Sequence, residues 1–217
     1  MMLGVEKMEL TNLSRDEKKA YDLERITDLV ERQEGVAQTA EIVDLGIDYR
    51  RILQFVEEGY LIRVKNGYYT TKYYKASEEA MIVRLFPDGI LTMETALFYY
   101  GYLKQRPYQW QIAISKNTSK SRFKLDYPNV QPYYCEAGVL SLGVGEIELA
   151  GKKMQIYTKE RLVCDCLKYQ EKMNREDFKA ALLSYIQDED KDVASLMEYA
   201  RERKVVKKVQ TMIGVWL

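Results

Sequence analysis

The sequence contains no histidine among its 217 residues. This absence excludes sites in which a serine or cysteine nucleophile depends on a histidine base, as well as zinc sites that need an imidazole ligand. Cysteine is also scarce: Cys135, Cys164 and Cys166 cannot form a paired disulfide framework, and the last two are too close for the CxxC spacing of a zinc site. We therefore expect reduced thiols in a cytoplasmic protein.

Long apolar runs are missing as well. No stretch approaches the roughly 18 consecutive apolar residues of a membrane-spanning helix, and residues 1–19 carry charges where a signal peptide is uninterruptedly apolar. The net charge is zero, with 33 basic and 33 acidic residues, which argues against a protein that coats nucleic acid without specificity. The hydrophobic content of 47% supplies core for one large domain or two small ones.

Residues 21–75 show the element order of a winged helix-turn-helix domain. Apolar residues at helical spacing predict a helix that ends at Gly35, a second helix over 39–45, and a third over 48–59 with Asp48 as its N-cap. Two short strands joined by an Asn-Gly turn over 61–71 predict a β-hairpin, which forms the wing.

Residues 77–217 are expected to form a second domain of mixed α/β type, so the predicted fold class is α+β. Helices are predicted over about 77–85, over 92–102 and from 159 onward, and strands over 111–114, 130–134, 145–149 and 154–157. Three C-terminal helices are expected to bury apolar faces: Phe178, Ala181, Leu182 and Tyr185; Val193, Leu196, Met197 and Ala200; and Val205, Val209, Met212 and Trp216.

The neutral total hides a basic segment, because residues 49–75 hold six basic and only two acidic side chains. The third helix is predicted to be a recognition helix that presents its N-terminal end to base edges in the major groove, while the wing reaches phosphates. The residues predicted to bind DNA are Tyr49, Arg50, Arg51, Gln54, Arg63, Lys65 and Tyr68. The alternative is that these charges are only solvated.

Two further basic groups lie in the second region. The Ser-rich segment 115–124 has four cations and no acid, which suits phosphate contact through Lys116, Lys120 and Arg122, although a solvated loop has the same composition. A second group is expected to line the solvent face of two helices and consists of Arg201, Arg203, Lys204, Lys207 and Lys208.

Signals for an enzyme are weaker. A metal-dependent nuclease needs no histidine, and its candidate residues are Glu146, Glu148 and Lys152, without a convincing spacing. The acidic run 188–192 is interpreted as a polar loop between helices and not as a metal site. A pure protein-interaction module is a further alternative. We expect no cofactor and no metal.

Three segments in this order resemble the AbiEi family of antitoxins from AbiE abortive-infection systems. They are the winged segment 46–69, ETALFYYG at 94–101 and IYTKERLVCD at 156–165, and the resemblance extends over about residues 24–217. It implies a non-enzymatic phage-defence protein whose winged helix binds inverted repeats in its own promoter and represses the operon. It also implies that the C-terminal domain counters a cognate nucleotidyltransferase toxin, as a type IV system in which the two proteins need not form a stable complex.

The resemblance also places Glu160, Arg161 and Asp165 at the family's recurrent motif, as candidates for antitoxicity or for a nucleic-acid surface. Taken from the residues alone, Arg161 and Asp165 lie four positions apart in a predicted helix. This spacing allows an ion pair within the helix, so we favour a scaffold role for them.

Overall fold

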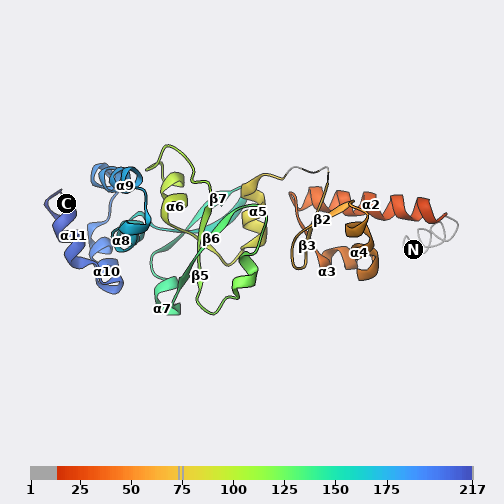
Figure 1. The fold of residues 1–217 in the computed structure, drawn as a ribbon. Coiled ribbons are helices and arrows are strands. Elements are labelled where there is room, and N and C mark those ends of the chain that lie inside the picture. Colours follow the sequence, from red (N-terminus) through yellow and green to blue (C-terminus); the bar gives the residue numbers. More distant parts are fainter. Residues whose placement is uncertain (1–13, 73, 75, 217) are drawn as a thin grey trace, which may run out of the picture. The chain divides into compact units, whose positions relative to one another are not determined.

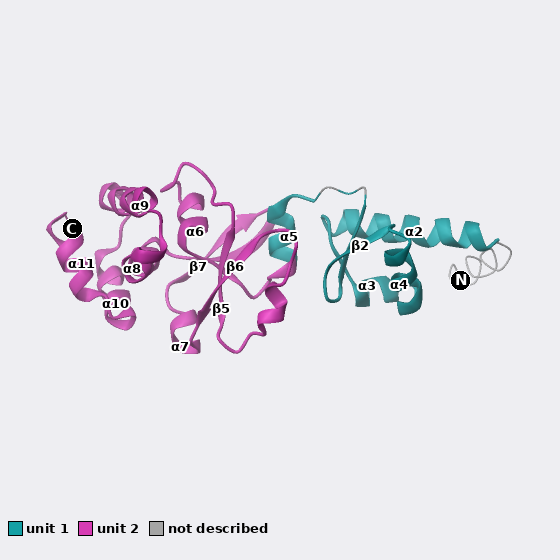
Figure 2. Ribbon diagram, viewed as in Figure 1, with its two compact units in different colours: residues 1–84 teal, residues 85–217 magenta. Residues whose placement is uncertain are grey.

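The computed structural model describes residues 14–72, 74 and 76–216. The chain divides into two compact units, residues 1–84 and 85–217 (Figure 2), and each is described separately. Residues 1–13, Lys75 and Leu217, on which some expectations above depend, lie outside the described residues. Of the helices that are described, none is long and apolar enough to cross a membrane.

The first unit is a winged helix-turn-helix, as the sequence predicted. Its elements are α2 (Arg15–Arg32), β1 (Ala37–Gln38), α3 (Thr39–Asp44), α4 (Tyr49–Glu57), β2 (Leu61–Lys65), β3 (Tyr68–Thr71) and most of α5 (Glu78–Leu85) (Figure 1). The three strands form an antiparallel sheet in the order β1-β3-β2. The strand β1 is too short to produce a recognisable sequence pattern, and it was not predicted.

Helix α2 begins earlier than the apolar pattern suggested. Its N-cap is Ser14, whose hydroxyl accepts a hydrogen bond from the Glu17 amide at 3.2 Å, while the Glu17 carboxylate accepts one from the Ser14 amide at 2.7 Å. This reciprocal capping box satisfies two amides that otherwise have no partner in the first turn. The helix therefore extends into a charged segment that its apolar periodicity does not mark.

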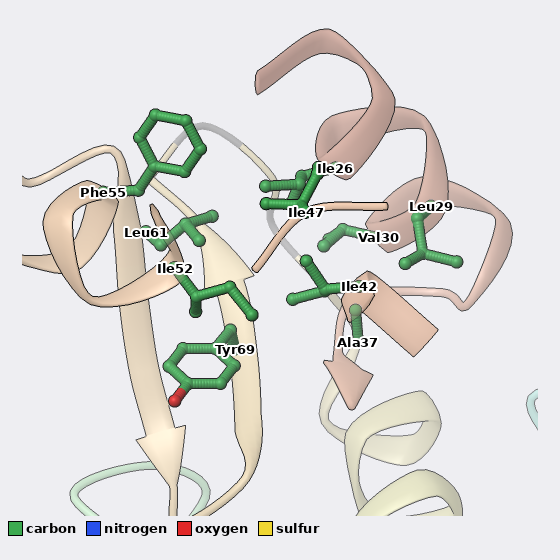
Figure 3. Packing of buried hydrophobic residues seen from close by; sticks show 10 residues of the cluster. All are labelled: Ile26, Leu29, Val30, Ala37, Ile42, Ile47, Ile52, Phe55, Leu61 and Tyr69. Carbon is green, nitrogen blue, oxygen red and sulfur yellow. The ribbon is translucent and has the colours of Figure 1, made fainter. Parts of the chain in front are cut away.

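A cluster of ten buried apolar residues holds these elements together (Figure 3). Helix α2 contributes Ile26, Leu29 and Val30, and the remaining members come from α3, α4, the sheet and the turn between helices. Each fully buried aliphatic or aromatic side chain contributes about 1.5–3 kcal/mol relative to exposure. The cluster thus fixes α4 on the small sheet and leaves the opposite face of α4 exposed.

The second unit is built on a five-stranded mixed sheet in the order β6-β5-β4-β8-β7. Its strands are β4 (Ile90–Leu91), β5 (Trp110–Ser115), β6 (Val130–Cys135), β7 (Val144–Leu149) and β8 (Lys152–Tyr157). The pairs β5–β6 and β4–β8 are parallel, whereas β4–β5 and the hairpin β7–β8 are antiparallel. The four predicted strands are confirmed, and the two-residue strand β4 joins them at the centre of the sheet.

Of the described helices in the second unit, two lie between its strands in the sequence, and four follow the last strand. They are α6 (Met93–Tyr99), α7 (Ala137–Leu140), α8 (Lys159–Tyr169), α9 (Arg175–Gln187), α10 (Val193–Arg203) and α11 (Val206–Met212), with 3-10 turns η2 (Lys120–Phe123), η3 (Gln170–Lys172) and η4 (Gly214–Trp216). The mixed α+β fold class is confirmed. The single-turn helix α7 was not predicted.

The predicted apolar face of the last helix is only partly correct. Val205 and Val209 are buried, but Met212 and Trp216 are exposed, and Ile213 is buried in their place. The reason is that α11 ends at Met212 and the chain enters the 3-10 turn η4. A 3-10 turn has 3.0 residues per turn and not 3.6, so the α-helical spacing no longer places Trp216 on the inner face.

Candidate nucleic-acid interface

Helix α4 is the predicted recognition helix, and its position is fixed by its N-terminal end and by its buried face. Gly46, with φ of +83°, makes the turn after α3 in a left-handed conformation that suits glycine. Asp48 then caps α4, because its carboxylate accepts a hydrogen bond from the Arg51 amide at 2.9 Å. Ile52 and Phe55 anchor the inner face in the core.

Two predicted DNA-binding residues are exposed at the start of α4. Tyr49 is 47% exposed and Arg50 is exposed too. Among the residues that the structure describes, none forms a hydrogen bond or ion pair with the Arg50 guanidinium. This side chain is therefore available to a ligand outside the protein.

The other two predicted residues of α4 are engaged within the unit. Arg51 donates from Nε to Asp22 Oδ2 of α2 at 3.3 Å and from Nη1 to Gln54 Oε1 at 3.1 Å, and its guanidinium lies 4.8 Å from the centre of the Phe55 ring. Gln54 in turn donates to Glu58 at 2.8 Å. Arg51 thus connects α4 to α2, and Gln54 links Arg51 to Glu58, roles that the sequence pattern did not reveal.

The same network continues along the two helices. Glu58 forms an ion pair with Lys19 of α2, with 2.6 Å between Oε2 and Nζ. The hydrogen bond from Lys19 lowers the pKa of Glu58, and that from Gln54 acts in the same direction. Two polar contacts, Asp22–Arg51 and Lys19–Glu58, therefore hold α2 alongside α4.

The wing positions its cations through contacts of its own. Arg63 on β2 donates to the Asn66 side chain in the turn, and the Lys65 ammonium lies 4.3 Å from the centre of the Tyr68 ring. The Tyr68 hydroxyl accepts from Gln38 Nε2 at 3.2 Å. Arg63 remains exposed, whereas Lys65 and Tyr68 are half-buried.

Two cations that the sequence pattern did not indicate lie beside the recognition helix. Arg15 and Lys18 of α2 line a cavity of about 470 Å³ together with Asp22, Arg51 and the turn at 46–48. They were overlooked because the predicted winged helix-turn-helix region began only at residue 21. The capping box of Ser14 and Glu17 was the sequence signal that identifies the true start.

In the second unit, the basic loop is held in place by two ion pairs. Lys116 lies 2.6 Å from Glu136, and Arg122 donates from Nη1 to Asp88 at 2.8 Å. Phe123 stacks on Phe86 with 5.1 Å between ring centres. Lys120 is exposed on the 3-10 turn η2.

Glu160, Arg161 and Asp165 do not form a surface, because all three are buried on α8. Arg161 donates from Nε to Asp165 at 3.0 Å and from Nη1 to the carbonyls of Val139 and Leu142 at 2.7 and 2.6 Å. The ion pair within the helix is therefore confirmed. Glu160 accepts a hydrogen bond from the Asp192 amide at 3.0 Å.

Arg203 requires a correction. It was expected on the solvent face, but it is buried and donates from Nε to the second carboxylate oxygen of Asp165 at 2.6 Å. Helices α8 and α10 are thereby joined through one carboxylate and two guanidinium groups. A basic residue near other basic residues in sequence looks solvated, and only the tertiary structure shows the buried acid that pairs with it.

Several of the acidic residues considered for an enzyme or a metal site have structural partners. Glu146 lies 2.8 Å from Lys153 on the neighbouring strand β8. Hydrogen bonds from Lys159 and Tyr102 lower the pKa of Asp188 to about 2, and Asp192 caps α10. Within residues 14–72, 74 and 76–216, no group of three or more Cys, Asp or Glu side chains is arranged to hold a metal ion.

Comparison with known families gives one match. Residues 24–72 match the family described as "Transcriptional regulator, AbiEi antitoxin". The match runs from α2 to just past β3 and so includes α4 and the wing. A search of curated proteins found none that matches the chain. The part of the resemblance that depends on residues 94–101 and 156–165 lies outside the matched segment and stays a prediction.

Proposed function

From the premise that residues 24–72 are an AbiEi antitoxin transcriptional regulator domain, we propose that this protein is an autorepressor and antitoxin. Helix α4 and the wing bind inverted repeats in the promoter of its own operon, and the second unit counters a cognate nucleotidyltransferase toxin without a stable complex. The observation that carries the DNA-binding part is the exposed start of α4, where Tyr49 and Arg50 stand opposite a fully buried face.

The contacts of α4 divide its residues into two roles. Arg50 reads a base edge, since arginine bonds guanine in bidentate fashion and this guanidinium has no partner among the described residues. Arg51, supported by Gln54, holds the helix on α2 and so sets the angle at which Arg50 enters the groove. Arg63 and Lys65 of the wing contact phosphates, with Tyr68 supporting Lys65.

The antitoxin part belongs to the second unit. Its buried motif of Glu160, Arg161 and Asp165 supports the scaffold and does not touch a partner. The surface candidates are Lys116, Lys120 and Arg122, of which Lys120 is exposed on η2 and has no ion pair with any described residue. We therefore propose Lys120 as the first residue to test for toxin neutralisation.

Fluorescence anisotropy of the full chain tests the DNA-binding part. The probes are a duplex of its own upstream DNA and a scrambled duplex, each at low and moderate salt. We expect the native duplex to bind at least about a thousandfold more tightly, as specific regulators do. Equal, weak binding of both duplexes with a steep salt dependence means an electrostatic contact only and contradicts the proposal.

Growth of cells that express the neighbouring toxin gene tests the antitoxin part. The full chain is expected to restore growth, the Arg50→Ala variant to restore it equally, and Lys120→Glu to restore it less. Lys207→Glu is the matched control, because Lys207 is also an exposed lysine but lies on α11. Full rescue by Lys120→Glu removes that residue from the antitoxin surface.

A further inference from the structure

The start of α2 and the start of α4 border one cavity in the first unit. The cavity has a volume of about 470 Å³ and is lined mostly by polar side chains. Its basic members are Arg15 and Lys18 of α2 and Arg51 of α4, and its acidic members are Asp22 and Asp48. We name this space the α2–α4 cavity.

The two carboxylates of the α2–α4 cavity are already engaged within the unit. Asp48 accepts a hydrogen bond from the Arg51 amide at 2.9 Å, and Asp22 accepts one from the Arg51 guanidinium at 3.3 Å. Arg15 and Lys18, by contrast, are exposed, and their side chains form no hydrogen bond or ion pair with any residue that the structure describes. The cavity therefore holds two basic side chains that are available to an anion.

The position of Arg15 and Lys18 is unfavourable for the helix itself. Both lie within the first four residues of α2, where the helix macrodipole opposes positive charge. Their spacing of three also places them on the same face, where like charges repel each other. The two acidic residues between them do not line the cavity. A bound anion relieves both effects, so a ligand explains these cations better than the stability of α2 does.

The place of the cavity beside α4 indicates which anion it takes. The turn 46–48 lines the cavity and leads directly into Tyr49 and Arg50, the exposed start of the proposed recognition helix. A helix that enters the major groove by its N-terminal end brings the elements beside that end to the phosphates at the edge of the groove. Arg15 and Lys18 precede the matched segment 24–72, so the family match by itself assigns them no role.

We propose that the α2–α4 cavity binds one phosphodiester group of the operator backbone through Arg15 and Lys18. The inference rests on the proposed function, since it takes DNA as the ligand and α4 as the recognition helix. A backbone contact carries no sequence information, but it fixes the register and orientation of a protein on the duplex. Arg15 and Lys18 thus position Arg50 over its base pair and make α2 part of the DNA-binding surface, together with α4 and the wing.

The salt dependence of DNA binding tests the proposal. The full chain is compared with a cavity variant, Arg15→Gln with Lys18→Gln, and with a control variant, Arg25→Gln with Arg32→Gln. The control removes the same charge from α2 outside the cavity. Anisotropy with the native and the scrambled duplex is measured over a series of salt concentrations.

We expect the cavity variant to bind both duplexes more weakly by the same factor. The slope of log affinity against log salt concentration is expected to become shallower by about one, the value for one phosphate. The control variant is expected to keep the slope of the full chain. An unchanged slope in the cavity variant overturns the proposal, as does an equal loss in the control or a loss confined to the native duplex.

Neutral methylphosphonate groups locate the phosphate on the DNA. Each of a set of native duplexes carries one methylphosphonate in place of a backbone phosphate. We expect at least one position at which this replacement weakens binding of the full chain and of the control variant. The same replacement should leave binding of the cavity variant unchanged, because the contact is already lost there. If the cavity variant responds like the full chain at every position, the cavity does not bind the backbone.

Free phosphate offers the same chemistry to the cavity, and thermal unfolding distinguishes it from the DNA backbone. Inorganic phosphate is compared with chloride at equal ionic strength. We expect the full chain and the cavity variant to respond alike, since the duplex as a whole holds the bound phosphodiester in place. A stabilisation by phosphate that only the full chain shows, together with an unchanged salt slope on DNA, assigns the cavity to a free anion and overturns the proposal.

The outcomes separate this inference from the proposed function. Because a phosphate contact does not depend on sequence, the salt slope on the scrambled duplex tests the cavity even in a protein that ignores its promoter. A shallower slope in such a protein supports the cavity and rejects autorepression. Specific promoter binding with an unchanged slope in the cavity variant does the reverse.

Discussion

Arg51 in the first unit and Arg161 in the second each form an ion pair that holds a helix in place, but the two pairs differ in their exposure to water. The Arg51–Asp22 pair is about one-fifth to one-quarter exposed, whereas Arg161 and Arg203 share the carboxylate of Asp165 in a fully buried network. Breaking a partly exposed ion pair such as this one costs little free energy, because water solvates the separated charges. A buried pair, by contrast, must stay intact, because each unpaired charge in the interior carries a large desolvation penalty. The first arrangement suits a DNA-binding surface, and the second suits a scaffold.

The largest effect is expected from breaking the buried network. Asp165→Ala leaves two guanidinium groups buried without their carboxylate, and loss of one partner of such a network typically destabilises a protein by about 3–5 kcal/mol. Urea unfolding followed by circular dichroism measures the change. Glu146→Gln is the control, since it removes an exposed partner of Lys153 and is expected to have a much smaller effect. A loss no larger than that of the control contradicts the structural role of Asp165.

The next effect separates the two neighbouring arginines of α4. Arg50→Ala is expected to weaken binding to the native duplex by about 1–3 kcal/mol and to relax discrimination at one base pair, because a bidentate contact to one base is lost. Its stability should hardly change, as the side chain is exposed. Anisotropy with single-base variants of the duplex provides the measurement. Equal loss on every sequence means that Arg50 contacts phosphate and not a base.

How far the sequence predicted the structure differs between these sites. Much of the first unit was predictable, because the Asp48 cap, the turn at Gly46 and the Asn-Gly hairpin are local signals that appear where the pattern placed them. The Ser14 cap at the start of α2 was missed. The role of Arg51 could not be predicted, because Asp22 lies 29 residues away in the sequence and only the packing of α2 against α4 brings the two side chains together. Arg161–Asp165 was predictable from a spacing of four, whereas Arg203 lies 38 residues from Asp165 and was assigned to solvent. The exposure of Trp216 was missed because a 3-10 turn replaces the last turn of helix.

A smaller effect is expected at Glu94, a buried carboxyl at the start of α6 that, unlike Asp165, has no arginine partner in the described residues. Burial raises its pKa above the ordinary value of 4.5, so the native state keeps this proton to higher pH than the unfolded chain. The stabilisation is fully present below pH 4.5 and is lost as the pH rises through the folded-state pKa. Glu94→Gln should raise stability at neutral pH by about 1 kcal/mol, the scale of one buried polar atom without a hydrogen-bond partner, because Oε2 of Glu94 has no such partner among the described residues. The same change should flatten the decline of stability with pH. Thermal unfolding between pH 4 and 8 measures the stability and its dependence on pH. A pH profile that Glu94→Gln leaves unchanged contradicts a raised pKa for Glu94. Glu148→Gln, at an exposed glutamate, is the control.

The smallest effect is expected at the partly exposed pair of Arg51 and Asp22, where the contrast with the buried pair of Arg161 and Asp165 can be tested directly. Asp22→Asn removes the carboxylate that Arg51 contacts, and pairs with this exposure contribute about 0.2–1 kcal/mol, decreasing as salt is added. We expect the loss of stability to disappear in high salt, whereas that of Asp165→Ala persists because salt hardly screens a buried charge. Freed from Asp22, Arg51 gains access to the DNA, so affinity for the scrambled duplex should rise while specificity falls. If Asp22→Asn instead destabilises the protein as strongly as Asp165→Ala, the packing of α2 on α4 depends on the Arg51–Asp22 pair as much as the second unit depends on its buried network. The exposure of an ion pair then does not decide its contribution to stability, which contradicts the comparison of Arg51 with Arg161.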